Sequence, residues 1–322
     1  MTAAQPLLAL QDVSLAFRTG GGLVRRSRRL TVLDGVNLEV GAGEALGLVG
    51  ESGCGKSSLA KTVLNLNRPT AGNVRYRGRD LASCTPADWR RLRRQVQYIF
   101  QDPLASLDPR MRVLDQVIEV LAVHDIGPPA ERRDRALAEL AAVGLDPDLA
   151  ANYPHALSGG QRQRAVIARA LALDPKLLIC DEPVSALDVS IQAQVVNLLA
   201  ELRRARGLAL LFISHDLSLV RHLCERVAIM YMGRIVEQGR VEQILDRPLH
   251  PYTRALVAAI PRAEPRRGEP PEVIEGETPS LLDPPAGCRF HPRCPRAIER
   301  CAAEAPLLTA QPDGRLAACH RL

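Results

Sequence analysis

The stretch that most limits what this chain can fold into is a glycine-rich turn between an apolar run and an amphipathic one. The turn reads GESGCGKS over residues 50–57 and matches G-x-x-x-x-G-K-[ST] at every fixed position. Its glycines let backbone N–H groups turn inward around phosphate oxygens. Lys56 is a compact cation for the β- and γ-phosphates, and Ser57 offers a hydroxyl to Mg²⁺. The sequence therefore predicts a strand, a phosphate-binding loop and a helix. The residues expected to contact the nucleotide here are Gly50, Glu51, Ser52, Gly53, Cys54, Gly55, Lys56, Ser57 and Ser58.

An acidic pair after a second apolar run supplies the partner that a phosphate-binding loop needs. Residues 177–180 are predicted to form a buried strand, and Asp181 and Glu182 follow it directly. From that position Asp181 can reach Mg²⁺, directly or through water, and Glu182 can polarise the attacking water. We therefore expect Ser57 and Asp181 to be magnesium ligands and Glu182 to be a catalytic residue.

Composition and charge limit the class of protein, but they do not indicate which kind of molecule the protein binds. The 322 residues carry a net charge of +6 and a pI of about 9.0, which suits nucleic acid, a membrane surface or a nucleotide alike. The N-terminus lacks a charged stretch ahead of an apolar core, and no run reaches the roughly 18 apolar residues of a membrane span. The sequence thus favours a cytosolic location, where its eight cysteines are expected to be reduced thiols or metal ligands.

A serine and two glycines ahead of an amphipathic helix form a second predicted anion site. The segment LSGGQ spans residues 157–161 and leads into QRQRAVIARALAL, and a Ser-Gly-Gly turn at a helix N-terminus is suited to an anion. LSGGQ resembles the signature motif of ATP-binding cassette (ABC) proteins. The resemblance implies that Ser158, Gly159, Gly160 and Gln161 close onto the γ-phosphate held by an opposing ATPase subunit, so that ATP is sandwiched between two subunits.

Four further residues resemble other motifs of this family and occur in the expected order. The resemblance implies that Gln101, in YIFQDP, contacts Mg²⁺ and water and couples to a membrane partner. It implies that Asp188, in SALD, crosses the dimer interface, and that His215, in FISHD, contacts the γ-phosphate. Phe17 resembles the aromatic residue that stacks on adenine, although tyrosine is more usual there. The alternatives are a core residue at a strand end for Phe17 and an ordinary loop glutamine for Gln101.

The expected fold class is α/β: an ABC-type P-loop domain with a RecA-like core, a β-subdomain and a helical subdomain, followed by a short Pro- and Cys-rich extension. We place the ATPase domain at 1–247, its helical subdomain at about 102–168, and the extension at 248–322. Residues 18–30 predict a basic hairpin, either solvated or near lipid headgroups. The extension begins with the composition of a linker or extended arm. Its HPYTRALVAAIP segment and cysteines resemble the extension of oligopeptide and dipeptide importer ATPases.

The extension contains four cysteines with the spacing C-x5-C-x6-C-x17-C. They are Cys288, Cys294, Cys301 and Cys319. Four soft ligands in a reducing compartment suggest a metal, but the spacing matches neither a typical zinc ribbon nor a ferredoxin. Resemblance to the importer ATPases implies a [4Fe-4S] cluster. Zinc, with His291 or His320 as a further ligand, and unligated thiols are the alternatives.

The resemblance implies the ATP-hydrolysing subunit of an ABC importer for peptides, working with Mg²⁺ at the cytoplasmic face of the inner membrane. Its expected partners are two transmembrane permease subunits and a second ATPase subunit, identical or related. An extracytoplasmic solute-binding protein would deliver the substrate, and no nucleic acid is expected. Import of nickel or glutathione is the main alternative. A soluble ABC ATPase acting on DNA or ribosomes, and an exporter ATPase, are the others.

Overall fold

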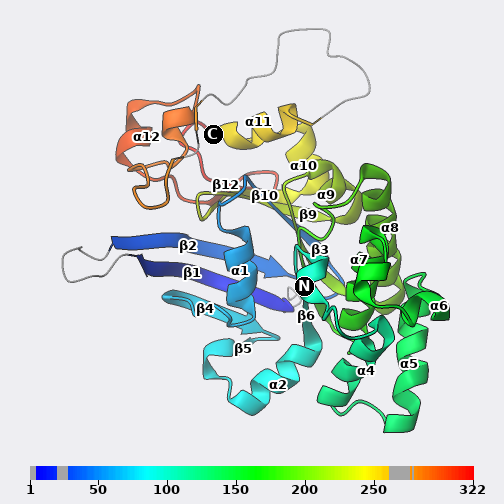
Figure 1. Ribbon diagram of the computed structural model, residues 1–322. Helices are drawn as coiled ribbons and strands as arrows, with labels where there is room; N and C mark the ends of the chain where they lie inside the picture. The colour runs from blue at the N-terminus through cyan, green and yellow to red at the C-terminus, as the bar shows by residue number, and fades with distance from the viewer. Residues whose placement is uncertain (1–4, 20–27, 261–275, 278) are drawn as a thin grey trace. The chain divides into compact units, whose positions relative to one another are not determined.

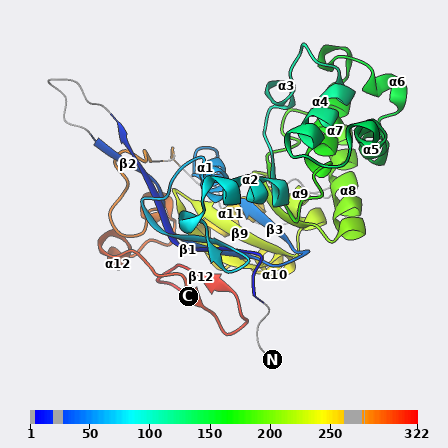
Figure 2. The same ribbon diagram turned by 90° about the horizontal axis from the view of Figure 1, so that it is seen from below.

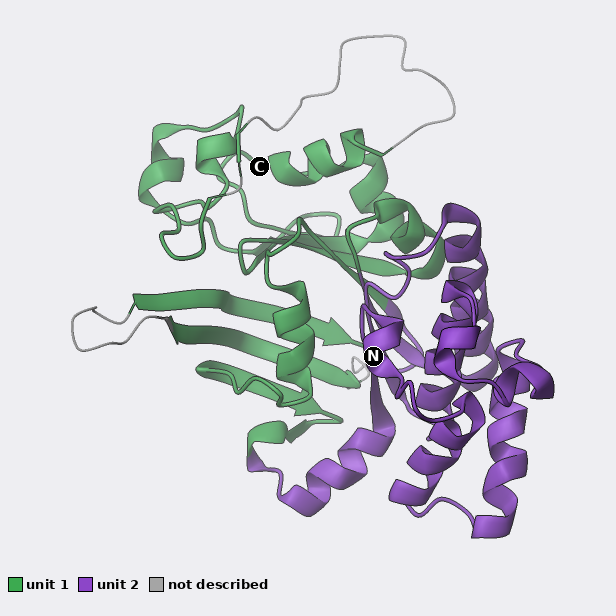
Figure 3. Cartoon of the chain, viewed as in Figure 1, with its two compact units in different colours: residues 1–40, 46–82, 214–322 green, residues 41–45, 83–213 purple. Residues whose placement is uncertain are grey.

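The computed structural model describes residues 5–19, 28–260, 276–277 and 279–322, which form two compact units. Unit 1 comprises residues 1–40, 46–82 and 214–322, and unit 2 comprises residues 41–45 and 83–213 (Figure 3). None of the helices in these described ranges is both long and apolar enough to cross a membrane.

The first sheet of unit 1 is antiparallel, and β2, β1 and β4 lie side by side in it (Figure 1). Its strands, in the order β2-β1-β4-β5, have the bounds β1 (Leu8–Thr19), β2 (Arg28–Val40), β4 (Ala71–Tyr76) and β5 (Arg79–Asp80). The β1–β2 ladder runs from Leu8↔Val40 to Thr19↔Arg28, so the two strands flank the predicted basic hairpin. The tip of that hairpin, residues 20–27, lies outside the described residues.

The second group of strands in unit 1 carries the segment before the phosphate loop. In the order β11-β12-β10-β9-β3 they are β11 (Thr309–Ala310), β12 (Leu316–Ala317), β10 (Arg234–Arg240), β9 (Arg226–Tyr231) and β3 (Ala45–Val49). Strand β3 is buried at every residue and pairs in parallel with β9, as expected for a strand covered on both faces. Gly47 is required here, because a Cβ would lie 2.4 Å from Cγ1 of Val220 on the covering helix α9 (Leu217–Leu223).

Short helices complete unit 1. They are α1 (Lys56–Val63), η1 (Leu81–Ser83, whose last residue belongs to unit 2), α9 (Leu217–Leu223), α10 (Val241–Asp246), α11 (Pro251–Ala258), η3 (His291–Arg293) and α12 (Glu299–Ala303). Glu237 of β10 is fully buried and accepts hydrogen bonds from the backbone N–H groups of Leu249 (2.9 Å) and His250 (2.8 Å). A buried carboxylate therefore fixes the start of α11 against the sheet.

The extension is more ordered than its composition predicts. Strands β11 and β12 add to the edge of β10, where Glu237 pairs with Ala317. Arg315 is buried, and its guanidinium lies 2.6 Å from Asp313 and 3.6 Å from Glu237. The linker prediction concerns residues 247–288. It is wrong for Pro251–Ala258, which form α11, while residues 261–275 and 278 lie outside the described residues.

Unit 2 combines three parallel strands with helices. The strands β6 (Val96–Ile99), β7 (Leu177–Asp181) and β8 (Ala209–Ser214) pair in that order. The helices are α2 (Pro86–Gln95), α3 (Pro103–Ser106), α4 (Val113–Val123), α5 (Pro129–Ala142), α6 (Pro147–Ala150), η2 (Pro154–Ala156), α7 (Gly159–Leu171) and α8 (Val189–Arg206). Figure 2 shows α3 to α7 gathered in one cluster, in the segment where the sequence predicts helices. Arg206 and Glu139 tie α8 to α5 through two hydrogen bonds of 3.2 and 2.8 Å.

Candidate nucleotide-binding and hydrolysis site

The phosphate loop of unit 1 has the predicted strand–loop–helix form. Strand β3 ends at Val49, and α1 begins at Lys56. Gly53 and Gly55 have φ of 78° and 111°, in the region that favours glycine. Gly50 is needed for another reason, because a Cβ there would lie 2.2 Å from the carbonyl oxygen of Met230. The predicted glycines therefore serve two purposes, turning the chain and letting β9 approach it.

Lys56 lies at the centre of this loop. Its side chain is buried, and its Nζ donates hydrogen bonds to the carbonyl oxygens of Gly50 (2.7 Å) and Glu51 (3.0 Å). Gly55, which precedes α1, has no side chain to cap the helix, and the first turn contains no acidic residue. An uncapped helix N-terminus beside a buried ammonium group is an electrostatically favourable place for phosphate oxygens.

Two side chains that the sequence analysis missed hold the same loop. The N–H of Glu51 donates to the hydroxyl of Tyr252 at 2.9 Å, and the Glu51 carboxylate accepts two hydrogen bonds from Arg293. Tyr252 falls in the HPYT segment, which the resemblance singles out without assigning a role. No sequence pattern distinguishes Arg293 from the other arginines, because all but three of the Lys and Arg residues of the chain are arginine.

The acidic pair of unit 2 lies at the end of β7, as predicted. Asp181 is 4 % exposed, and its Oδ2 accepts a hydrogen bond of 2.5 Å from the hydroxyl of Tyr98 on β6. Glu182 accepts a hydrogen bond of 3.3 Å from Nε2 of Gln101. The structure therefore brings together Gln101 and Glu182, which lie 81 residues apart in the sequence. Tyr98 is a third residue that the sequence analysis missed, although it lies three positions before Gln101.

The backbone at Glu182 is held in an uncommon conformation. Its φ is 48°, which is rare for a residue with a side chain and costs about 1–3 kcal/mol. Its N–H donates to the carbonyl oxygen of Ile213 at 3.0 Å, and its carbonyl oxygen accepts from the hydroxyl of Ser185 at 3.1 Å. Backbone strain maintained by such contacts is typical of functional positions, and here it fixes the direction of the carboxylate.

The signature segment begins α7 with a reciprocal cap. Ser158 Oγ accepts from the N–H of Gln161 at 3.3 Å, and Oε1 of Gln161 accepts from the N–H of Ser158 at 2.8 Å. Cβ atoms on Gly159 and Gly160 would lie 3.1 Å from Leu187 and 2.6 Å from Ile191. The close approach of Ile191 therefore leaves no room for a side chain at Gly160, and the approach of Leu187 leaves little at Gly159.

The remaining predicted residues are accessible. Asp188 precedes α8 and makes no side-chain cap, and it is exposed together with Val189. His215 follows β8 in unit 1 and is exposed. Phe17 lies near the end of β1 and is 39 % exposed, which excludes the alternative that it is a core residue.

The four tail cysteines are free thiols in the structure: Cys301 is buried, and the other three are half-buried. Burial raises the pKa of Cys288, and the thiols of Cys301, Cys294 and Cys319 raise it further. His291 and His320 each place a ring nitrogen 2.9 Å from a backbone carbonyl oxygen. Within the described ranges, no group of three or more His, Cys, Asp or Glu side chains is arranged to hold a metal ion. The described residues therefore show no metal centre at these cysteines, so the expected iron–sulfur cluster stays a prediction and we derive no chemistry from it.

Comparison with known proteins places this geometry in a family. The family model described as ABC transporter matches residues 33–185, and the one described as oligopeptide/dipeptide transporter, C-terminal region, matches residues 236–301. The oligopeptide transport ATP-binding proteins OppF of Salmonella typhimurium and Escherichia coli are 50 % and 48 % identical to this chain. Each alignment covers 94 % of the chain and 92 % of the relative.

Solved structures agree with these matches. A dimeric, post-hydrolysis structure of the ATP-binding cassette MJ0796 bound to ADP and Pi is similar, with a TM-score of 0.65 and 29 % identity. The match covers 73 % of this chain and 98 % of that one. The chain therefore belongs to the ATPases of ABC transporters, and within them to the oligopeptide/dipeptide transporter family.

Proposed function

We propose that this chain is the ATP-hydrolysing subunit that powers import of peptides through an ABC transporter. The observation that carries the proposal is a similarity over almost the whole chain to oligopeptide transport ATP-binding proteins, including the C-terminal region. The phosphate loop and the acidic pair give this similarity a chemical basis, because they are the parts that ATP hydrolysis needs.

We propose the following roles around ATP. The loop 50–58 surrounds the phosphates with backbone N–H groups, and Lys56 places its ammonium at the β- and γ-phosphates. Ser57, Asp181 and Gln101 would hold Mg²⁺, which neutralises charge on the phosphate oxygens. Phe17 would stack on the adenine.

Hydrolysis needs a group that orients water at the γ-phosphate. Glu182 is suited to take the proton from this water, since its carboxylate is fixed by the backbone and hydrogen-bonded to Gln101. His215 would contact the γ-phosphate. The oxygen of water forms a bond to the γ-phosphorus while its proton passes to Glu182; the bond between the γ-phosphorus and the bridging oxygen breaks, and ADP leaves with that oxygen.

A second ATPase subunit would complete the site. The signature residues Ser158, Gly159, Gly160 and Gln161 lie at the start of α7, and this helix N-terminus, with the N–H groups of Gly159 and Gly160, would meet the γ-phosphate of the partner's ATP. Asp188 and the exposed Val189 lie where the segment before α8 reaches the surface.

Permease subunits are the other proposed partners. Phe100 and Leu104 flank Gln101 and are 42 % and 50 % exposed, so apolar side chains are available next to the residue expected to couple to the membrane. We propose that two transmembrane permeases dock here and hold the chain at the cytoplasmic face of the inner membrane. A solute-binding protein on the other side would supply the peptide. Nickel and glutathione stay open as substrates, because this subunit does not bind the cargo.

We also retain two predictions about organisation. The first is the division into an ATPase domain (1–247, with its helical subdomain at about 102–168) and an extension (248–322). The second is a [4Fe-4S] cluster, or zinc, on the four tail cysteines. The four cysteines of the extension and the match of residues 236–301 to the oligopeptide/dipeptide transporter C-terminal region support this prediction, and the side chains would have to rearrange to form such a centre.

The test is ATP binding and hydrolysis by two variants with matched controls. Lys56→Ala should lose hydrolysis and most ATP binding, because backbone N–H groups alone cannot replace the cation. Lys176→Ala is the control, since Lys176 is half-exposed and its ammonium group pairs with the exposed carboxylate of Asp174. Near-normal turnover in Lys56→Ala would remove the phosphate-loop assignment.

A further inference from the structure

We propose that Arg293, in the C-terminal extension, positions the phosphate loop for ATP through its ion pair with Glu51. The extension is then a working part of the ATP site. This inference rests on the proposed function, because it assumes that the loop 50–57 binds ATP. It concerns unit 1 alone, which contains both segments.

The direct contact is a two-pronged ion pair. Nη1 of Arg293 lies 2.9 Å from Oε2 of Glu51, and Nη2 lies 3.2 Å from Oε1, although the two residues are 242 positions apart. The side chain of Arg293 is only 9 % exposed, and that of Glu51 is 26 % exposed. A bidentate arginine–carboxylate pair with limited access to water restricts both partners more than a surface pair does. The pair therefore fixes the first side chain of the loop.

A second contact fixes the backbone of the same residue. The hydroxyl of Tyr252 accepts the N–H of Glu51 at 2.9 Å. The Tyr252 ring packs on Tyr231 and Phe290, with centroid separations of 4.7 and 5.5 Å, and Arg293 lies over the ring of Tyr231 at 5.9 Å. Phe290 is 1 % exposed. The aromatic cluster thus holds Arg293 and Tyr252 in place beside the loop.

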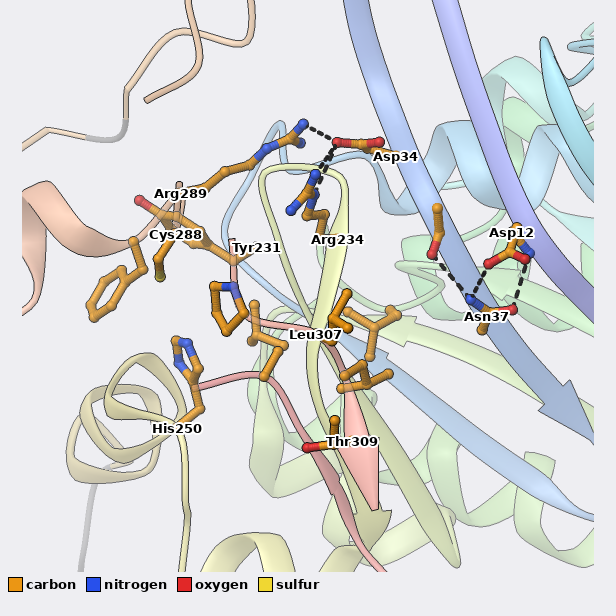
Figure 4. A pocket seen from close by; sticks show the side chains of 17 residues that line it. Asp12, Asp34, Asn37, Tyr231, Arg234, His250, Cys288, Arg289, Leu307 and Thr309 are labelled. Atoms are coloured by element: carbon orange, nitrogen blue, oxygen red, sulfur yellow. Dashed lines mark hydrogen bonds and ion pairs between the residues drawn. The ribbon is translucent and has the colours of Figure 1, made fainter. Parts of the chain in front are cut away.

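A third connection reaches the far end of the loop. Arg289 donates to the carbonyl oxygen of Met232, and the N–H of the next residue, Gly233, donates to the carbonyl oxygen of Cys54 at 2.7 Å. Figure 4 shows Arg289 and Arg234 converging on Asp34 beside a cavity of about 470 Å³. The Arg234 guanidinium lies 2.8 Å from Asp34, and Arg289 pairs with the same carboxylate. The extension therefore contacts the loop directly at Glu51 and is connected to Cys54 only through Met232 and Gly233.

The negative charge of Glu51 determines whether loss of Arg293 strengthens or weakens ATP binding. Glu51 is part of the loop that receives a highly negative triphosphate, so an unpaired carboxylate there would repel ATP. Arg293 compensates this charge. Without Arg293, ATP binding should weaken; without the carboxylate as well, most of that loss should disappear.

The experiment is a double-mutant cycle on the full chain, with ATP affinity measured by titration of a fluorescent ATP analogue. Arg293→Ala should weaken binding about tenfold, within the range measured for contacting charged pairs. In the Glu51→Gln background the same change should weaken binding less than about threefold. Arg293→Lys should recover part of the affinity. For hydrolysis, KM for ATP should rise in Arg293→Ala while kcat changes little.

Controls separate positioning from folding of the extension. Arg300→Ala removes an exposed ion pair with Glu304 in the same extension, and it should leave ATP affinity unchanged. An equal loss for Arg293→Ala with and without Glu51→Gln would overturn the inference, because it would show a general effect on the extension. The inference would also be overturned if Arg293→Ala bound ATP with the affinity of the unmodified chain while Lys56→Ala had lost ATP binding. If Lys56→Ala itself binds ATP normally, the proposed function fails instead.

Discussion

Replacing Tyr98 by phenylalanine removes one oxygen atom and tests the hydrogen bond that Tyr98 donates to Asp181 of the acidic pair. In the structure the Tyr98 hydroxyl donates to Asp181 at 2.5 Å, a distance typical of a charge-assisted O–H···O⁻ bond. Burial raises the pKa of Tyr98, and the hydrogen bond to Asp181 raises it further. The hydroxyl therefore remains protonated and serves as a donor throughout the physiological pH range.

The size of the effect follows from the burial of Asp181. A hydrogen bond to a charged group contributes about 1.5–3 kcal/mol, and its removal leaves the carboxylate, 4 % exposed, with one donor fewer. Asp181 has other interactions, so we expect Tyr98→Phe to lower the free energy of unfolding by about 2 kcal/mol. Bound Mg²⁺ would compensate the same charge, so Mg·ATP should reduce the loss to less than about 1 kcal/mol.

Urea unfolding with and without Mg·ATP measures both quantities. Tyr153→Phe is the control, since Tyr153 is 40 % exposed, and it should change stability by less than about 0.5 kcal/mol. A Tyr98→Phe protein as stable as the unmodified chain would refute the reasoning on the hydrogen bond. A loss that is the same with and without Mg·ATP would count against Asp181 as a magnesium ligand.

Three further predictions follow from the structure. Burial lowers the pKa of His250 to about 3, whereas the pKa of histidine in the unfolded chain is about 6.5. The free energy of unfolding should therefore decrease as the pH drops below about 6.5. His250→Gln should reduce this decrease in acid-unfolding curves. Gly160→Ala would place a Cβ 2.6 Å from Ile191, so it should lower the free energy of unfolding by about 1–3 kcal/mol and lower the rate of ATP hydrolysis. Gly127→Ala is the control: a Cβ there meets no atom within 4 Å, so this variant should lose only the stability that its positive φ costs. Anaerobically purified protein should contain iron and sulfide that are lost when any tail cysteine is replaced by serine; free, alkylatable thiols and no metal would contradict the cluster.

The phosphate loop and the acidic pair could be predicted because their chemistry is local in sequence. A glycine turn between strand and helix, and two carboxylates after a buried strand, each occupy a few consecutive residues. The structure confirms the strand–loop–helix form around Lys56 and the position of Glu182 at the end of β7. The resemblance to ABC proteins supplied what local patterns could not, namely the pairing of the signature segment with another subunit.

What the sequence missed depends on contacts between distant segments. Arg293 reaches Glu51 across 242 positions and Tyr252 reaches it across 201, so no spacing rule could find either. The start of the extension, residues 247–288, has the composition of a linker because it is rich in proline and has little periodicity. The extension folds because Phe290 and β12 pack on residues far upstream. For the signature glycines, the approach of Leu187 and Ile191 is likewise visible only in three dimensions.

Peptide uptake by reconstituted vesicles tests the central claim most directly. The chain would be assembled with its permeases and solute-binding protein, and entry of a labelled peptide would be followed with Mg·ATP inside or outside the vesicles. The account predicts uptake that requires Mg·ATP on the side of this chain and is abolished by Glu182→Gln, which should still bind ATP because only the carboxylate that accepts the proton of water is replaced. Glu304→Gln, an exposed carboxylate of the extension, should leave uptake intact. Uptake that continues at the normal rate with Glu182→Gln, or hydrolysis that supports no peptide transport in the complete assembly, would contradict it.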